Sequence, residues 1–217
     1  MAIPSRQIGW GTEENLLWQI SKQLEYLTGV TYKSLSELAP TYKVYTALLT
    51  QSGGDDPQSI GSGAVTEGVT YMVDGTGSDA DFSNVGGPKY DGVTSINGTY
   101  FVAINNDIPN NYSEGQLNYN TGAPVVTVLE NTIGNIWFEY FTDGNYAAIS
   151  NGLFTLNKSI CIAMPNQYVE SPESLYNFQA FITTTNTFSL NTFFNYAPQD
   201  GILNGFAQTS IEIRVYN

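Results

Sequence analysis

The chain has 217 residues, enough for one large domain or for a small module joined to a domain of ordinary size. Histidine is absent, which excludes Ser-His-Asp and Cys-His catalysis and removes the commonest metal ligand. The net charge is −13, and this acidity argues against direct nucleic-acid binding, which needs clustered lysine and arginine.

The charge is distributed unevenly along the chain. Residues 1–43 contain four basic and four acidic residues, so the whole net charge of −13 lies beyond residue 43. A neutral, amphipathic beginning joined to a strongly acidic remainder suggests that one end packs against protein while the other stays exposed to solvent.

The first predicted element is a helix of about sixteen residues. Thr12 is suited to the N-cap, and Glu13 and Glu14 follow in the first turn, where the helix dipole favours anions. Gly29 stands where a residue with positive φ would end the helix. Beyond it, Ser34 has capping-box spacing and predicts a separate short turn of helix before Pro40.

Apolar residues along this helix follow the 3-4-3 spacing of a coiled-coil seam, and further apolar residues widen the stripe. A helix this short is marginal in water, so its apolar stripe must be covered. The width favours packing in threes, or docking into a larger surface; the alternative is that the helix lies against its own β-domain. The residues expected to serve oligomerisation or anchoring are Trp10, Leu16, Leu17, Trp18, Ile20, Leu24 and Leu27.

The remainder, rich in Tyr, Phe, Thr and Val with scattered Gly and Pro, predicts β-structure. The expected fold is mainly β, a short N-terminal helix followed by an antiparallel β-sandwich or jelly roll, with an anchor at 1–40 and an exposed β-domain at 41–217. Strands are expected at 42–50, 64–73, 99–105, 117–119, 125–130, 136–142, 146–150, 160–164, 178–185, 188–196 and 209–216.

Three details of these strands are specific enough to test. The first strand places Tyr42, Val44, Thr46 and Leu48 on one face. Asp143-Gly144 is a hairpin turn signal. In the last strand, the alternation predicts that Ile211, Ile213 and Val215 point inward.

The sequence offers only weak candidates for a metal site or a catalytic site. The segment Asp74–Asp81 carries oxygen ligands for Ca²⁺ but lacks EF-hand spacing, so an acidic loop tip is preferred and no metal or cofactor is expected. Glu130 with Glu139 or Asp143 could form a glycosidase pair, although the sequence cannot place two carboxylates across a sugar. Cys161 lies in an apolar run and is expected to be a small buried thiol.

Tyrosines beside Asn and Gln are better candidates, because an amphipathic ring next to amides can both stack and hydrogen-bond. The residues expected to face a ligand are Tyr112, Tyr119, Tyr168 and Tyr176. The alternative is that each packs a sandwich face. No apolar run is long enough for a membrane span and no signal peptide is evident, so synthesis in a reducing cytoplasm is expected.

The segment 3–30, IPSRQIGWGTEENLLWQISKQLEYLTGV, resembles a leader found in virion fibre and appendage proteins of tailed bacteriophages, notably crAss-like phages and related phages of Bacteroidetes. The segments YKVYTALLTQSGGDDP (42–57), YNTGAPVVTVLENTIGNIWF (119–138) and IEIRVYN (211–217) resemble parts of the same proteins. The resemblance is patchy but runs nearly end to end. It carries no catalytic residues.

The resemblance implies a non-enzymatic fibre or decoration protein of the virion, made in the host bacterial cytoplasm. The expected partners are further copies of the chain, as a homotrimer or a dimer, and capsid or tail proteins bound through the N-terminus. Weak adhesion of the β-domain to a host-surface glycan is a further expectation. One alternative is a tail receptor-binding protein with carbohydrate-binding or depolymerase activity. Another is a decoration protein that cements capsomers.

Overall fold

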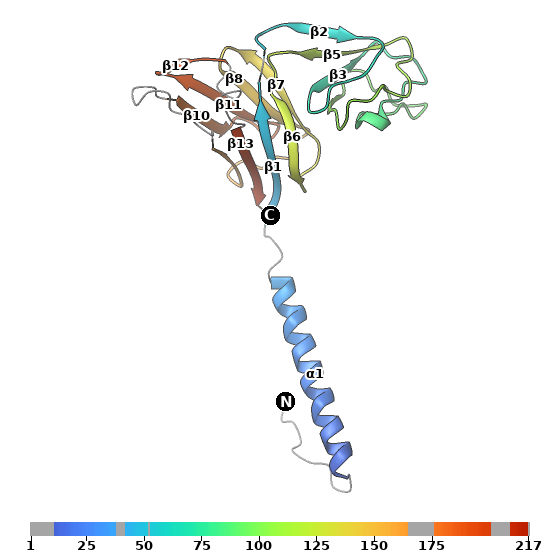
Figure 1. Ribbon diagram of the computed structural model, residues 1–217, viewed down its shortest axis with the longest axis vertical. Helices are drawn as coiled ribbons and strands as arrows, with labels where there is room; N and C mark the ends of the chain where they lie inside the picture. Colours follow the sequence, from blue (N-terminus) through green and yellow to red (C-terminus); the bar gives the residue numbers. More distant parts are fainter. Residues whose placement is uncertain (1–10, 38–41, 52, 165–175, 201–208, 217) are drawn as a thin grey trace. The chain divides into compact units, whose positions relative to one another are not determined.

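A computed structural model of the chain describes residues 11–37, 42–51, 53–164, 176–200 and 209–216. The chain forms two compact units, residues 1–41 and residues 42–217. The described part of the first unit is a single helix, and the second unit contains three antiparallel sheets (Figure 1). The expected class, mainly β with one N-terminal helix and an antiparallel sandwich, is confirmed.

The helix α1 (Thr12–Glu37) has 26 residues, about 39 Å at the usual rise. The predicted end at Gly29 and the predicted separate turn at Ser34 are therefore wrong, because one helix runs through both. An isolated glycine costs a helix only about 1 kcal/mol relative to alanine, which is too little by itself to end a helix. The helix ends before Pro40, as a proline requires of the residues that precede it.

Two sheets form the sandwich. The first has the strand order β6-β1-β13-β9 and the second the order β10-β11-β8-β7, with β12 paired to β11. Strands 42–50, 136–142 and 209–216 have the predicted bounds. The elements of the first sheet are β1 (Tyr42–Thr50), β6 (Val125–Asn131), β9 (Ser159–Met164) and β13 (Thr209–Tyr216); those of the second are β7 (Ile136–Thr142), β8 (Asn145–Ser150), β10 (Tyr176–Ile182), β11 (Thr187–Phe194) and β12 (Ala197–Pro198).

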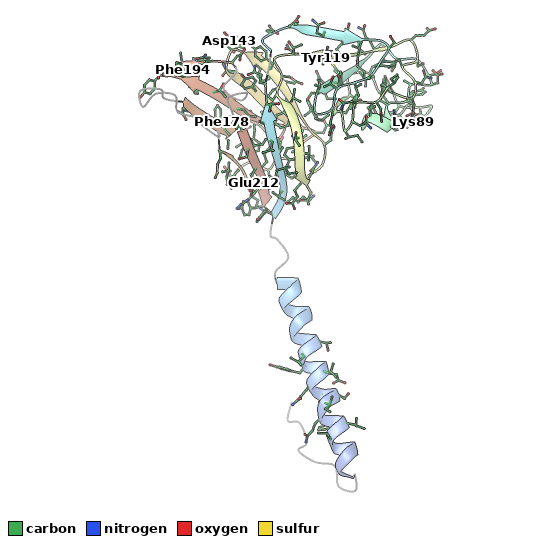
Figure 2. All side chains as sticks on the ribbon, in the orientation of Figure 1. Lys89, Tyr119, Asp143, Phe178, Phe194 and Glu212 are labelled. Carbon is green, nitrogen blue, oxygen red and sulfur yellow. The ribbon has the colours of Figure 1, made fainter. Side chains whose placement is uncertain are left out.

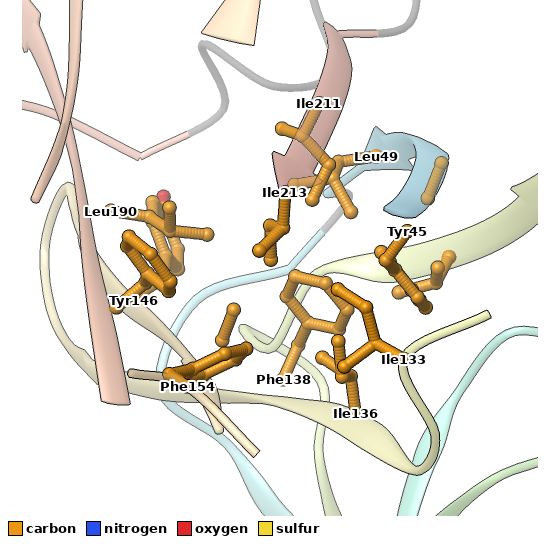
Figure 3. Packing of buried hydrophobic residues seen from close by; sticks show 14 of the residues in the cluster. Tyr45, Leu49, Ile133, Ile136, Phe138, Tyr146, Phe154, Leu190, Ile211 and Ile213 are labelled. Atoms are coloured by element: carbon orange, nitrogen blue, oxygen red, sulfur yellow. The ribbon is translucent and has the colours of Figure 1, made fainter. Parts of the chain in front are cut away.

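The main core lies between these two sheets (Figure 3). Ile211, Ile213 and Val215 of β13 point inward, as predicted. On β1, the buried face carries Tyr45 and Leu49. The opposite face carries Tyr42, Val44, Thr46 and Leu48, the residues that the sequence pattern places together. The register explains this result, because Tyr45 lies opposite Ile213 and therefore shares its face.

A second β-unit is inserted into the sandwich between β1 and β6. Thr50 and Val125 are paired, so the chain leaves and re-enters the sandwich at neighbouring positions. The inserted sheet has the order β2-β5-β3-β4 and its own core, which includes Tyr71, Phe82 and Phe101. Its elements are β2 (Pro57–Ile60), β3 (Thr70–Asp74), the 3-10 turn η1 (Ser83–Val85), β4 (Tyr100–Val102) and β5 (Gln116–Asn120).

The insertion was not predicted from the sequence. Strands were expected at 64–73 and 99–105, whereas β3 and β4 are shorter, and no strand was expected where β2 lies. Strands of three to five residues are too short to show a clear alternation, and the second core is built largely from loop residues such as Val65 and Ile96.

Backbone contacts hold the inserted sheet to the sandwich. The amide of Val126 donates to the Gly68 carbonyl at 2.9 Å, and the Gly68 amide donates to the Ala103 carbonyl at 2.8 Å. The amide of Phe138, on β7, donates to the Thr70 hydroxyl at 3.1 Å. Gly68 therefore joins three segments at one point.

We predict that Gly68→Ala destabilises the protein more than Gly75→Ala does. Both glycines have positive φ, but a Cβ at Gly68 would lie 2.4 Å from the Val126 carbonyl oxygen, whereas Gly75 has open space. Gly75→Ala should lower the free energy of unfolding by about 1 kcal/mol, and Gly68→Ala by at least about 2 kcal/mol. Urea unfolding of the full chain measures both, and equal losses would contradict the role of Gly68 as a close junction.

Candidate functional site

The apolar stripe of α1 is exposed. Leu16, Leu17, Ile20, Leu24 and Leu27 are between 44 % and 67 % exposed. Trp18 is half-buried, and Trp10 lies outside the described residues. An amphipathic helix with an exposed apolar face is a site for association with another apolar surface.

Among the described side chains of α1, polar contacts contribute little to the stability of the helix. Lys22 Nζ lies 2.7 Å from Glu25 Oε2, but both side chains are exposed, and such pairs are worth about 0.5 kcal/mol or less. Continuing the seam spacing beyond Leu27 reaches Thr31 and Ser34, both polar, so the apolar seam ends near the middle of the helix. The apolar residues from 16 to 27 are therefore the main stabilisation still open to the described part of α1, if another surface covers them.

The four tyrosines expected to face a ligand lie in different environments. The expectation for Tyr112 is wrong, because its ring is buried edge-on against Phe82 and its hydroxyl donates to the Gly63 carbonyl at 2.9 Å. Tyr119, labelled in Figure 2, is half-buried. Its ring centroid lies 5.2 Å from that of Tyr71. Tyr168 lies outside the described residues, as does the side chain of Tyr176 at the start of β10.

A groove of about 460 Å³ lies where the inserted sheet meets β7. Its sheet wall is one face of four strands, because Met72 pairs with both Tyr100 and Asn118, and Asn118 pairs with Ser59. Tyr119 borders the groove from the neighbouring position on β5. The complete lining is Pro57, Gln58, Ser59, Thr70, Met72, Tyr100, Asn118, Tyr119, Asn120, Ala123, Phe138, Glu139 and Tyr140.

An aromatic pair lies beside the groove, and one of its members, Tyr100, lines it. The rings of Tyr100 and Trp137 are stacked, with centroids 5.4 Å apart and planes inclined by only 9°. Glu139 Oε1 accepts a hydrogen bond from Trp137 Nε1 at 3.2 Å. Burial, and then the adjacent Glu139 carboxylate, raise the pKa of the Tyr100 hydroxyl. The phenol therefore stays neutral, and the indole, the phenol and the carboxylate hold one another in place.

Tyr140 lines the groove and is also held firmly. Its hydroxyl lies 2.8 Å from Asp200 Oδ2 and 2.9 Å from Asp143 Oδ1, within the predicted Asp143-Gly144 hairpin turn between β7 and β8. Asp200 also accepts hydrogen bonds from the Tyr146 hydroxyl at 2.8 Å and from the Gly144 amide at 2.7 Å. Burial, followed by these carboxylates, raises the pKa of Tyr140. Its ring position is thus set from outside the groove.

The amides of the groove are oriented by aspartates. Asn118 Nδ2 donates to Asp74 Oδ2 at 3.0 Å, and Asn120 Nδ2 donates to Asp55 Oδ1 at 2.7 Å. Gln58 Nε2 likewise donates to Asp56 Oδ1, at 2.8 Å. Each amide is therefore fixed by a partner, and the surroundings of the groove are rich in negative charge.

The carboxylates proposed as a glycosidase pair do not share a wall. Glu139 is the one acidic residue among those that line the groove, within the part of the chain that the structure describes. Asp143 is at the hairpin turn, and Glu130 lies on β6 opposite Thr46. Hydrolysis of a glycosidic bond by the usual routes needs two carboxyl groups flanking the substrate.

The segment Asp74–Asp81 does not gather its carboxylates either. Within the ranges described here, no group of three or more potential metal ligands occurs. The hydroxyl of Ser83, and then the Lys89 ammonium, hold the pKa of Asp81 well below its usual range. The three aspartates turn to different partners: Asp74 to Gln116 and Asn118, Asp79 to Asn111 and Ser113, and Asp81 to Ser83 and Lys89.

Cys161 is half-buried on β9 and packs against the main core. Burial raises the pKa of its thiol to about 12. Because the thiolate is the reactive form, this cysteine lacks the character of a nucleophile.

No family model, curated protein or solved structure matches the chain. Among the described residues, no helix has both the length and the apolarity needed to cross a membrane.

We predict that Cys161 resists alkylation in the folded protein. At about pH 8, a thiol with a pKa near 12 should react with iodoacetamide on the order of a thousandfold more slowly than the same thiol in the unfolded chain. Mass spectrometry of the native and the urea-unfolded protein measures both rates, with Cys161→Ser as the unlabelled control. Equal rates would show that the thiol is accessible and ionised.

Proposed function

We propose that this chain is a non-enzymatic structural protein of a tailed-phage virion. In this proposal it is a multimeric fibre or decoration protein on the head or the tail, anchored by its N-terminus. The observation that carries the proposal is the exposed apolar stripe between Leu16 and Leu27 on α1, in a unit separate from the β-structure. The resemblance of segment 3–30 to phage appendage leaders supports the same conclusion.

The charge distribution fits this division of roles. The neutral beginning of the chain is suited to packing against protein, and the acidic remainder is suited to exposure on a particle. We place the chain on the virion, with the N-terminal arm docked on capsid or tail proteins. We also propose that the helices associate, three together, through the stripe, because its width exceeds a two-stranded seam.

The sandwich carries a second surface that suits self-association. Ile160, Ile162 and Met164 on β9 point away from the main core and are 41 %, 41 % and 64 % exposed. Cys161 and Ala163, between them, face the core, so β9 is apolar on both faces. A strand with this pattern is typical of one covered on both sides. Contact between the β-units of neighbouring copies would provide that cover.

We predict that Leu24→Glu destroys most of the helical signal in far-UV circular dichroism of the full chain. In proteins most helix stability comes from packing of the apolar face rather than from helix propensity, so breaking the seam should melt much of α1. Gln19→Glu is the matched control, because it adds the same charge at an exposed position away from the seam. The helical signal of the parent should also rise with protein concentration if association stabilises the helix. If both variants keep the parental helicity and that helicity does not change with protein concentration, the helix does not depend on association.

The anchoring role predicts that deletion of residues 1–29 abolishes incorporation into particles. The deleted protein should remain folded, because neither core includes any residue of that segment whose side chain the structure describes. Immunoblotting of purified virions measures incorporation. Deleted protein present on virions at the parental level would overturn the anchoring role.

The alternative is a tail receptor-binding protein with carbohydrate-binding or depolymerase activity, and the groove with its aromatic lining favours the carbohydrate-binding form. A reducing-sugar release assay on host capsular or mucin polysaccharide separates the two functions. Turnover would refute the non-enzymatic function. A purely cementing role predicts instead that virions lacking the protein lose heat resistance while adsorption is unchanged.

A further inference from the structure

We propose that the groove between the inserted sheet and β7 is the binding site for a short, neutral glycan. Tyr100 is the stacking surface in this proposal. The inference rests on the proposed function in one respect, that the β-unit is exposed on a particle.

The shape and the floor of the groove suit a sugar. Its volume of about 460 Å³ lies within the range of small-molecule sites, about 300–1,000 Å³. The buried residues Thr70, Ala123 and Phe138 form its floor, and the half-exposed rings of Tyr100 and Tyr140 line it. A pyranose ring has an apolar face of C–H groups, and an aromatic ring with one open face is complementary to it.

The Tyr100 ring, which is the stacking platform of the proposed site, is held in place before a ligand binds. Trp137 supports Tyr100 from one side at a near-parallel inclination of 9°, which holds the phenol ring without a ligand. The Asp200 and Asp143 carboxylates hold the Tyr140 hydroxyl in the same way. Fixing these rings before binding lowers the entropy cost of association.

Polar groups beside the rings match the hydroxyls of a sugar. Asn118 and Ser59 lie on adjacent paired positions of the sheet wall, and Glu139 provides a carboxylate acceptor beside the platform. Because Asn118 commits its Nδ2 to Asp74, its amide plane is fixed and its carbonyl oxygen is oriented. Oriented acceptors next to an aromatic face give selectivity among sugar hydroxyls.

The negative charge in and around the groove disfavours acidic glycans. Glu139 lines the groove, and Asp55, Asp56 and Asp74 hold its amides. A sialic acid or uronate would meet these carboxylates at close range and be repelled. The glycan should therefore be neutral.

The experiment uses the full chain and a panel of neutral oligosaccharides of glucose, galactose and N-acetylhexosamines, each with a sialylated or uronate-containing counterpart. Titration at millimolar concentrations is followed by tryptophan fluorescence, since Trp137 lies directly behind the platform. We expect at least one neutral member to bind and its acidic counterpart to bind at least tenfold more weakly. Tyr100→Ala should weaken binding about tenfold. Tyr196→Ala, at a tyrosine that is 84 % exposed and does not line the groove, should leave it unchanged.

A second variant keeps the test interpretable if Tyr100→Ala does not fold. Ser59→Arg adds bulk at an exposed position of the groove wall and should block binding while the urea unfolding curve stays parental. Failure of every neutral glycan to bind, tighter binding of the acidic counterparts, or equal binding by Ser59→Arg would each overturn the inference. Ser59→Arg should still enter particles like the parent, so loss of the glycan site and loss of the anchoring role are separate results.

Discussion

The exposed apolar stripe on α1 is the constraint on which the account of this protein depends. Burying leucine and isoleucine side chains is worth about 1.5–3 kcal/mol each, and α1 presents Leu17, Ile20, Leu24 and Leu27 at seam spacing without burying them. The ion pair between Lys22 and Glu25 cannot replace that contribution. Covering the stripe with other polypeptides would stabilise the helix and tie its folding to assembly.

The structure of the β-unit depends on a different constraint, the contacts that join the core of the sandwich to the core of the inserted sheet. The backbone of Gly68, the hydroxyl of Thr70 and the stacked rings of Tyr100 and Trp137 connect the inserted sheet to the sandwich. The same contacts bring the outer face of the inserted sheet up to β7, which creates the groove. A rigid joint is therefore both a structural element and the means of positioning the proposed site.

Much of the sandwich was predictable because its strands are long enough to show alternation. The last strand, from Thr209 to Tyr216, has the predicted bounds and buries the predicted face. The face of β1 was not predictable, since both faces carry apolar or aromatic residues and only pairing with Ile213 decides which is buried. Gly29 was misread because one glycine costs a helix only about 1 kcal/mol, which is too little by itself to end it.

The candidate site was predictable only in type. A tyrosine beside amides was expected to face a ligand, but Tyr112 is buried in the second core, and Tyr100 was read as part of an ordinary strand. The residues of the groove come from strands whose pairing is set by the insertion, and sequence spacing does not show which outward face meets β7. Tyr100 becomes a site residue because Trp137 lies behind it, 37 positions along the chain.

Sedimentation equilibrium of the full chain beside a chain beginning at Tyr42 tests the central claim most directly. The full chain should have three times its monomer mass of 23.7 kDa, and the shorter chain should be a monomer or associate much more weakly. A full chain that remains monomeric with α1 intact would contradict the claim that other polypeptides cover its apolar stripe.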